Sequence, residues 1–156
     1  MLSFDAAVPE DESFFFELYA STRDEELASW GWGFSEKESF LNMQFEFQRR
    51  MFDTQYPDAV TRIVCADRCR VGRVVVADRP DAIYVIDLSL LPQYQNQRIG
   101  TTYLQILQSE ARVCEKPIRL NVQSANRALR LYQRLGFQVI QEQGVYYRME
   151  WSPLSL

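Results

Sequence analysis

The stretch QYQNQRIGTTYL, residues 93–104, follows an apolar run and Pro92, and its composition bears most directly on the fold. Residues 95–98 place three amide side chains and one guanidinium in succession, and Gly100 follows shortly after. A plain connector needs Gly, Asn, Asp or Pro to turn the chain rather than a series of hydrogen-bond donors. The stretch therefore indicates a loop that begins a helix and offers these donors to a ligand.

A loop between a strand end and a helix start suits an anion, because the first-turn N–H groups lack intrahelical partners and the helix dipole adds to them. Gly100 lets a ligand approach the backbone, Arg98 can bind a phosphate with two N–H groups, and Gln95 can donate an amide. A diphosphate fits these donors. The glycines of a P-loop and of a dinucleotide fingerprint are absent. A polar helix start, with Gly100 packed against a strand, is the alternative.

The periodicity of apolar residues predicts the element order β-α-α-β-β-β-α-β-α-β-β. A capping box at Ser35 and Glu38 is expected to begin one helix, along which apolar residues 40, 43, 47 and 51 repeat on one face. The predicted strands are residues 2–8, 59–66, 70–77, 82–91 and 118–122, with a closing hairpin around 143–144. The predicted helices are residues 9–20, 35–51, 97–114 and 124–135, the last ended by Gly136. Residues 24–30 are a further candidate for a second short helix, outside this order.

This order predicts an α+β fold, an α/β three-layer arrangement in which a mixed, mostly antiparallel sheet of six or seven strands is flanked by helices. The length of 156 residues fits one domain, residues 1–156. No apolar run is long enough to span a membrane, and the N-terminus does not resemble a signal peptide. A cytoplasmic protein is expected.

Charge is unevenly distributed along the chain. Residues 1–60 carry 13 acidic and 4 basic side chains, whereas residues 61–156 carry 8 acidic and 13 basic ones. The C-terminal part therefore favours an anion and the N-terminal part a cation, unless these are only two solvated surfaces. No basic stripe of the kind that binds nucleic acid is seen.

The chain has no histidine, which excludes Ser-His-Asp and Cys-His catalysis. Any acid or base must be Asp, Glu, Tyr, Cys, Lys or water. The three cysteines, at positions 65, 69 and 114, have no spacing typical of a metal site and are expected to be free thiols in a reducing compartment. No metal is expected.

A second informative stretch is LNVQSANRALRLYQRLGF, residues 120–137, with Asn126 near a helix start and Tyr132 two turns in. Together with DLSLLPQYQNQRIGT, residues 87–101, it resembles the GCN5-related N-acetyltransferase (GNAT) superfamily. The resemblance implies the acyl-CoA N-acyltransferase (GNAT) fold and an enzyme that moves an acetyl group from acetyl-CoA directly to a primary amine. Tyr132 would then protonate the departing thiolate. Aromatic packing is the alternative role of this tyrosine.

The resemblance also implies where coenzyme A binds. The family's pyrophosphate loop, Gln/Arg-x-x-Gly-x-Gly/Ala, aligns with residues 95–100, and Arg98 stands where the first glycine is expected. The preceding strand would pair with the pantetheine arm, and an N–H near Leu90 would polarise the thioester carbonyl. Asn126 lies one position after the family's asparagine, so it either reaches the cofactor or caps a helix. The implied cofactor-binding residues are Leu88, Ser89, Leu90, Gln95, Asn96, Gln97, Arg98, Ile99, Gly100, Thr101, Asn126 and Tyr132.

The sequence offers more than one candidate for the general base. Some family members use a glutamate in the strand before the loop, and Tyr84 occupies the aligned position. Asp87 is the carboxylate of this strand, but alternation places it on the face opposite Tyr84, Leu88 and Leu90. Asp87 is therefore either the catalytic base or a structural carboxylate, and a water relay is a third possibility.

The acceptor is expected near the acidic N-terminal helices and is either a small amine or a protein N-terminus. Trp30, Trp32 and Phe34 lie close together and either line an amine pocket through cation–π contacts or pack in the core. Two other functions remain open: a non-catalytic acyl-CoA-binding sensor on the same fold, and a nucleotide-phosphate-binding module unrelated to CoA. A homodimer through an exposed edge of the closing hairpin, residues 145–151, is a further expectation.

Overall fold

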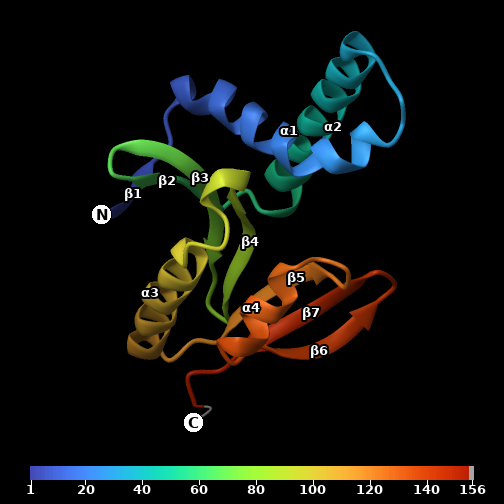
Figure 1. The fold of residues 1–156 in the computed structure, drawn as a ribbon. Helices are drawn as coiled ribbons and strands as arrows, with labels where there is room; N and C mark the ends of the chain where they lie inside the picture. The colour runs from blue at the N-terminus through green and yellow to red at the C-terminus, as the bar shows by residue number, and fades with distance from the viewer. Residues whose placement is uncertain (155–156) are drawn as a thin grey trace. The chain divides into compact units, whose positions relative to one another are not determined.

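The computed structural model describes residues 1–154, except for the side chain of Glu25. Its elements follow the predicted order and form one seven-stranded mixed sheet, β1-β2-β3-β4-β5-β7-β6, with flanking helices (Figure 1). This confirms the predicted fold class. The strands are β1 (Leu2–Ala6), β2 (Val60–Ala66), β3 (Cys69–Asp78), β4 (Ile83–Leu90), β5 (Ile118–Gln123), β6 (Gln138–Gln143) and β7 (Tyr146–Trp151). The helices are α1 (Glu12–Ala28), α2 (Phe34–Gln55), α3 (Ile99–Cys114) and α4 (Ala128–Arg134), with 3-10 turns η1 (Pro9–Asp11) and η2 (Pro92–Tyr94).

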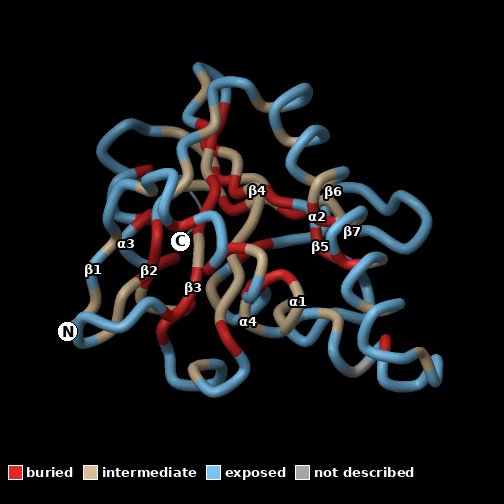
Figure 2. The backbone as a smooth tube through the Cα atoms, turned by 90° about the horizontal axis from the view of Figure 1, so that it is seen from above, coloured by how far each residue is buried: buried red, intermediate tan, exposed pale blue. Residues whose placement is uncertain are grey.

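The chain divides into two compact units. Unit 1 contains Met1–Val75 and Leu88–Gln95, and unit 2 contains Val76–Asp87 and Asn96–Leu156. The division falls inside β3, inside β4 and inside the loop before α3. Buried residues occur mainly along the strands and the inner helix faces, which are red in Figure 2.

Unit 1 is held together by an aromatic and aliphatic core beneath α1 and α2. Phe45 of α2 lies with its ring centroid 5.5 Å from that of Phe16 and 5.7 Å from that of Tyr19, both on α1. β1 pairs antiparallel with β2, from Leu2 opposite Ala66. The buried members of this core are Phe14, Phe15, Leu18, Tyr19, Leu27, Leu41, Phe45, Ile63 and Leu91.

Two expectations for the N-terminal helices were wrong. α1 continues through the segment predicted to form a second short helix and ends at Ala28. α2 begins at Phe34 with Gly33 as its N-cap, so Ser35 lies inside the helix and makes no capping bond. The charged run before Ala28 consists mostly of adequate helix formers, and an extended Gly33 can serve as the cap.

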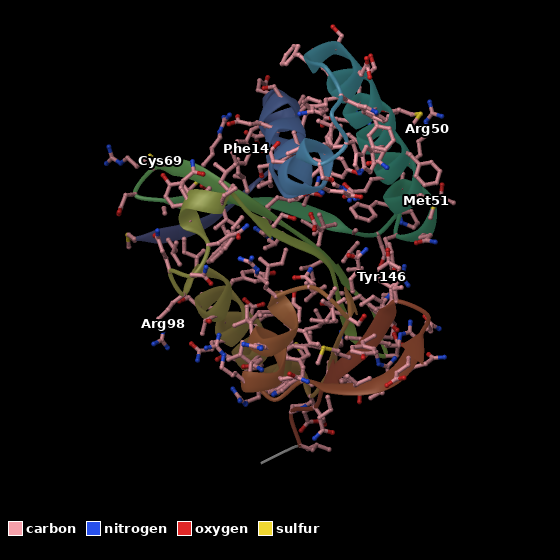
Figure 3. The ribbon with its side chains drawn as sticks, turned by 45° about the vertical axis from the view of Figure 1, so that its right-hand side comes forward. Phe14, Arg50, Met51, Cys69, Arg98 and Tyr146 are labelled. Atoms are coloured by element: carbon pink, nitrogen blue, oxygen red, sulfur yellow. The ribbon has the colours of Figure 1, made fainter. Side chains whose placement is uncertain are left out.

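The repeat of apolar residues along α2 does not mark its buried face. Leu41 and Phe45 are buried. Met43, Phe47 and Met51, which we call the outer row, are 61%, 65% and 38% exposed, and Met51 is labelled in Figure 3. This helix carries apolar residues on more than one face, and its packing against α1 selects which face is covered.

Unit 2 contains the C-terminal part of the sheet with α3 and α4. β4 pairs in parallel with β5 over Ile83–Val85, and β5 pairs antiparallel with β7 along its whole length. The buried Gln108 of α3 donates its amide to the carbonyl of Leu135 at the end of α4, at 2.9 Å. Gly136 follows with a φ of 96°, as its predicted role as a helix stop requires.

The closing hairpin forms as predicted, but its exposed edge was assigned to the wrong strand. β7 lies between β5 and β6, so β6 is the edge strand of the sheet. All six residues of β6 are exposed, and its register with β7 shifts between Val139 and Gln141. In the described part of the chain, no helix combines the length and apolarity needed to cross a membrane.

Candidate functional site

The end of β4 in unit 1 is fixed by close backbone packing. A Cβ added to Gly72 of β3 would lie 2.6 Å from the Leu90 side chain and would also collide with the Ser89 carbonyl oxygen. The N–H of Leu91 donates to the carbonyl of Val71 at 2.8 Å. Only glycine allows this approach, so Gly72 sets the position of residues 89–91.

The Gln95 side chain already has a protein partner. Its amide donates to the Leu90 carbonyl oxygen at 3.0 Å, across the η2 turn. One of its two amide hydrogens is therefore used inside unit 1 to hold the loop against the strand end, and one is left for a ligand.

The loop before α3, in unit 2, has an unusual backbone. Asn96 and Arg98 have φ angles of 62° and 65°, in the left-handed region that favours glycine. Arg98 is the N-cap of α3, and no side chain caps this helix end. The first hydrogen bond of α3 runs from the N–H of Thr102 to the Arg98 carbonyl at 2.9 Å.

This loop can bind an anion at the start of α3. The N–H groups of residues 99–101 precede the first hydrogen bond of the helix, so they have no acceptor within it and point out of its N-terminal end. The Arg98 side chain is exposed at this end, where it is labelled in Figure 3. Arg98 therefore adopts the conformation expected of the family glycine that it replaces, and adds a guanidinium beside the uncapped N–H groups.

Tyr132 and Asp87 lie near one another in unit 2. Tyr132 is 7% exposed, and its ring contacts Phe137 edge-on with centroids 5.7 Å apart. Burial, and after it the negative charge of Asp87, raises the pKa of Tyr132 to about 12. The structure thus brings the two candidate catalytic residues into electrostatic contact, although strand alternation alone gave no reason to expect it.

The Tyr132 hydroxyl forms no hydrogen bond with any other residue that the structure describes. Its raised pKa keeps the phenol protonated at neutral pH. A protonated phenol without a partner among these residues is available as a hydrogen-bond donor.

Asn126 caps α4. Its side-chain oxygen accepts a hydrogen bond from the Ala128 N–H at 2.8 Å, and its carbonyl accepts one from Leu129 at 3.1 Å. Of the two roles open from the sequence, capping is the one that the structure contains.

The tryptophans of residues 29–34 form an aromatic cluster with Phe40 rather than with Phe34. The centroid of Trp30 lies 4.9 Å from that of Trp32 and 5.4 Å from that of Phe40. Phe40 packs on the core of unit 1, whereas Phe34 is 81% exposed. This arrangement favours packing between α1 and α2 over a cation-binding pocket.

Tyr84, at the position aligned with the family's glutamate, takes part in a polar network. Its hydroxyl donates to Asp81 at 2.8 Å and accepts from Arg119 at 3.2 Å. Arg119 also pairs with Glu150 at 2.7 Å. Tyr84 therefore has a structural role, because both hydrogen bonds of its hydroxyl are made within the protein.

A cavity in unit 1 brings together residues that no sequence motif marks. One face of α1 and the segment 91–93 line it, and Glu17 and Asp24 are its carboxylates. Their separation of seven residues, two helical turns on one face, is the one signal that could have identified them. No group of side chains able to hold a metal occurs among residues 1–154.

Comparison with known proteins identifies the family. The model of the acetyltransferase (GNAT) domain matches residues 33–155. The chain belongs to the GNAT acetyltransferase family. GNAT membership supports acetyl transfer as the general activity. No curated protein matches the sequence.

Several solved structures share this fold at low sequence identity. The PaiA N-acetyltransferase of Thermoplasma acidophilum, solved in complex with coenzyme A, has a TM-score of 0.74 and 18% identity, covering 97% of this chain and 99% of that one. The ribosomal-protein-S18-alanine N-acetyltransferase of Escherichia coli has a TM-score of 0.66 and 14% identity, covering 100% and 96%. PH1933 of Pyrococcus horikoshii OT3 has a TM-score of 0.68 and 17% identity, covering 97% and 98%.

Proposed function

We propose that this chain is a single-domain N-acetyltransferase that moves the acetyl group of acetyl-CoA directly to a primary amine of a small molecule or a protein N-terminus. The observation that carries the proposal is the start of α3, where left-handed Asn96 and Arg98 precede an uncapped helix end. GNAT membership, and a similar fold solved with coenzyme A, support the cofactor.

The proposed cofactor contacts follow from this loop. The first-turn N–H groups of residues 99–101 and the Arg98 guanidinium bind the pyrophosphate, because aligned N–H dipoles and a charged fork both favour phosphate oxygens. Gln95, Asn96 and Gln97 supply further polar contacts. The backbone of residues 88–90 receives the pantetheine arm, with the Leu90 N–H as donor to the thioester oxygen. Asn126 contributes through the helix end that it caps.

In the proposed reaction a neutral amine attacks the thioester carbonyl, a C–N bond forms and the C–S bond breaks. Tyr132 donates a hydrogen bond to the departing sulfur. Its pKa of about 12 keeps the phenol protonated at neutral pH. Because an ordinary thiol has a pKa of about 8.5, this phenol stabilises the thiolate by sharing its proton more than by releasing it. Asp87, whose charge acts on Tyr132, is the candidate that accepts the amine proton directly or through water.

The first experiment is thermal unfolding with acetyl-CoA, with ATP as the control ligand. At about 100 times its dissociation constant, a ligand of the native state adds about 2.7 kcal/mol of stability. We expect a shift with acetyl-CoA and none with ATP. A shift with ATP alone would favour the nucleotide-phosphate module, and no shift with acetyl-CoA would contradict the proposal.

One observation favours a second candidate, a non-catalytic acyl-CoA sensor. The position of the family's glutamate is held by Tyr84, which is committed to Asp81 and Arg119. An amine panel separates the two candidates, because the enzyme transfers acetyl groups and the sensor only binds the cofactor. Tyr132→Phe is expected to lower kcat by about 100-fold, the usual lower range for a proton donor in the transition state. Unchanged kcat would remove Tyr132 from the mechanism.

Two further expectations are kept as proposals. A homodimer formed by edge pairing would use β6, and a single species at monomer mass over a wide concentration range would contradict it. Cys65, Cys69 and Cys114 are free cysteines, as a protein kept in the reducing cytoplasm would have.

A further inference from the structure

One side of α2 carries a row of side chains spaced alternately by four and three residues. In chain order the row contains an acid, an aromatic ring, a thioether, a second aromatic ring and a base: Glu36, Phe40, Met43, Phe47 and Arg50. Steps of three and four residues keep side chains on one side of an α-helix, as in the contact line of a coiled coil. We call these five residues the seam.

The middle of the seam is apolar and open to solvent. Met43 and Phe47 are 61% and 65% exposed, and Met51 of the outer row lies beside them. Phe40 is half-buried, because it also packs on the core of unit 1. Figure 3 shows Arg50 and Met51 on the side of α2 that faces away from α1. Large apolar side chains gathered in one exposed row indicate an interaction surface, whereas single exposed ones do not.

The two ends of the seam carry opposite charges that are available to a partner. Glu36 is exposed and forms no hydrogen bond or ion pair with any residue that the structure describes. The Arg50 side chain is 78% exposed, and its guanidinium lies 3.6 Å from Glu46. Glu46 binds Arg49 more closely, at 2.7 Å. Arg50 can therefore bind a second carboxylate.

The seam is complementary to itself when one copy is reversed. Glu36 and Arg50 each lie seven residues from Met43, which is about 10 Å along the helix axis. A two-fold axis at Met43 would place the Arg50 of a second copy opposite Glu36 at both ends of the seam. Phe40 lies three residues before Met43 and Phe47 four residues after it, so the rings also meet in pairs. An isologous contact between two copies of a chain requires a surface of this kind.

We propose that α2 pairs antiparallel with α2 of a second copy of this chain, with Met43 at the two-fold axis. Phe40 packs on the Phe47 of the second copy, and Glu36 binds its Arg50. A parallel pair is disfavoured because it would place like charges side by side at each end. One helix pair buries less than the ~1,600 Å² of a standard interface, so we expect a dissociation constant of about 10–100 μM.

Sedimentation equilibrium of the native protein, from low micromolar to near-millimolar concentration, tests the proposal. We expect a reversible equilibrium between monomer and dimer. Phe47→Glu should raise the dissociation constant by at least about 100-fold, because it buries an unpaired charge in the apolar middle of the seam. Val113→Glu is the matched control, since it adds the same charge at an exposed apolar position of α3. The control should leave the dissociation constant unchanged.

Charge reversal tests the two ends of the seam. Glu36→Arg and Arg50→Glu should each raise the dissociation constant about ten-fold or more, because like charges then face one another at both ends. An equimolar mixture of the two variants should dimerise as strongly as the native protein, since the heterodimer restores opposite charges. Added salt should weaken the native dimer and strengthen that of Glu36→Arg, because it screens attraction in the first and repulsion in the second.

Three results would overturn the inference. The first is a native protein that stays monomeric over the whole concentration range. The second is a dimer that Phe47→Glu leaves intact, because such a dimer would use another surface, such as the β6 edge. The third is a mixture of the two charge variants that dimerises no better than either variant alone. Acetyl-CoA takes no part in these measurements, so their outcome is independent of the proposed function.

Discussion

Replacement of Arg98 by glycine and by alanine separates the backbone of the α3 loop from its side chain. Arg98 has φ 65° and ψ 14°. An L-residue in the left-handed region costs about 1–2 kcal/mol, which glycine avoids. Glycine in turn loses about 0.5–1 kcal/mol more than alanine through backbone entropy on folding. The net expectation is that Arg98→Gly is more stable than Arg98→Ala by about 0.5–1 kcal/mol.

The assay is reversible urea unfolding of both variants, supported by thermal unfolding. For a chain of this length, a difference of about 1 kcal/mol corresponds to roughly 2–4 °C in Tm. Gln105, exposed in the middle of α3, supplies the control pair. There glycine should be less stable than alanine by about 1 kcal/mol, the opposite sign, because the helix interior disfavours glycine.

The same two variants test the guanidinium. Both should weaken acetyl-CoA binding by about ten-fold or more, since a hydrogen bond to a charged group contributes about 1.5–3 kcal/mol. Two results would refute the reasoning. If Arg98→Gly proves less stable than Arg98→Ala, the left-handed strain is absent. If both variants bind acetyl-CoA as tightly as the native protein, the guanidinium does not hold the phosphate.

Three further predictions concern stability. Gly72→Ala should destabilise by about 2–3 kcal/mol in urea unfolding, because the new Cβ would overlap the strand end at Leu90; Gly33→Ala, whose Cβ would meet nothing within 4 Å, should change stability by less than about 1 kcal/mol. Because the pKa of Tyr132 is raised in the folded state, the unfolded state loses the Tyr132 proton at a lower pH than the folded state does. The free energy of unfolding should therefore be unaffected by this group below pH ~10 and should fall by up to about 3 kcal/mol towards pH 12. Tyr132→Phe should remove this part of the loss in unfolding free energy at alkaline pH. If the variant and the native protein lose stability identically between pH 10 and 12, the raised pKa of Tyr132 is contradicted. Gln108→Met should cost about 1–3 kcal/mol of unfolding free energy in the same assay by leaving the part-buried Leu135 carbonyl unpaired, and a neutral effect would mean that water replaces the amide.

The order of elements could be predicted from the sequence because strand and helix periods differ and turn residues separate the elements. Which face of a helix would be buried could not be predicted from the sequence. α2 carries Leu41 and Phe45 on one side and the outer row on another, and only tertiary packing decides which is buried. The edge of the sheet was likewise undetermined, because a hairpin sequence does not say which of its strands pairs with β5.

The candidate site was only partly predictable, and for local reasons. The donors of residues 95–98 could be seen, but not that Gln95 binds the Leu90 carbonyl or that Arg98 adopts a glycine conformation. The effect of Asp87 on Tyr132 depends on how α4 packs on the sheet, which strand alternation does not encode. Glu17 is one carboxylate among many in the acidic N-terminal region, and only the cavity distinguishes it.

The outer row of α2 has a consequence for oxidative chemistry. Met43 and Met51 expose their side chains to solvent, whereas Met149 is fully buried in unit 2. Peroxide converts accessible thioethers to sulfoxides, which are polar and chiral. Oxidation would therefore reach Met43 and Met51 well before Met149 and turn an apolar strip beside Phe47 into a hydrophilic one. Because Leu41 and Phe45 hold α2 on its other face, the helix would keep its packing while its surface changed character.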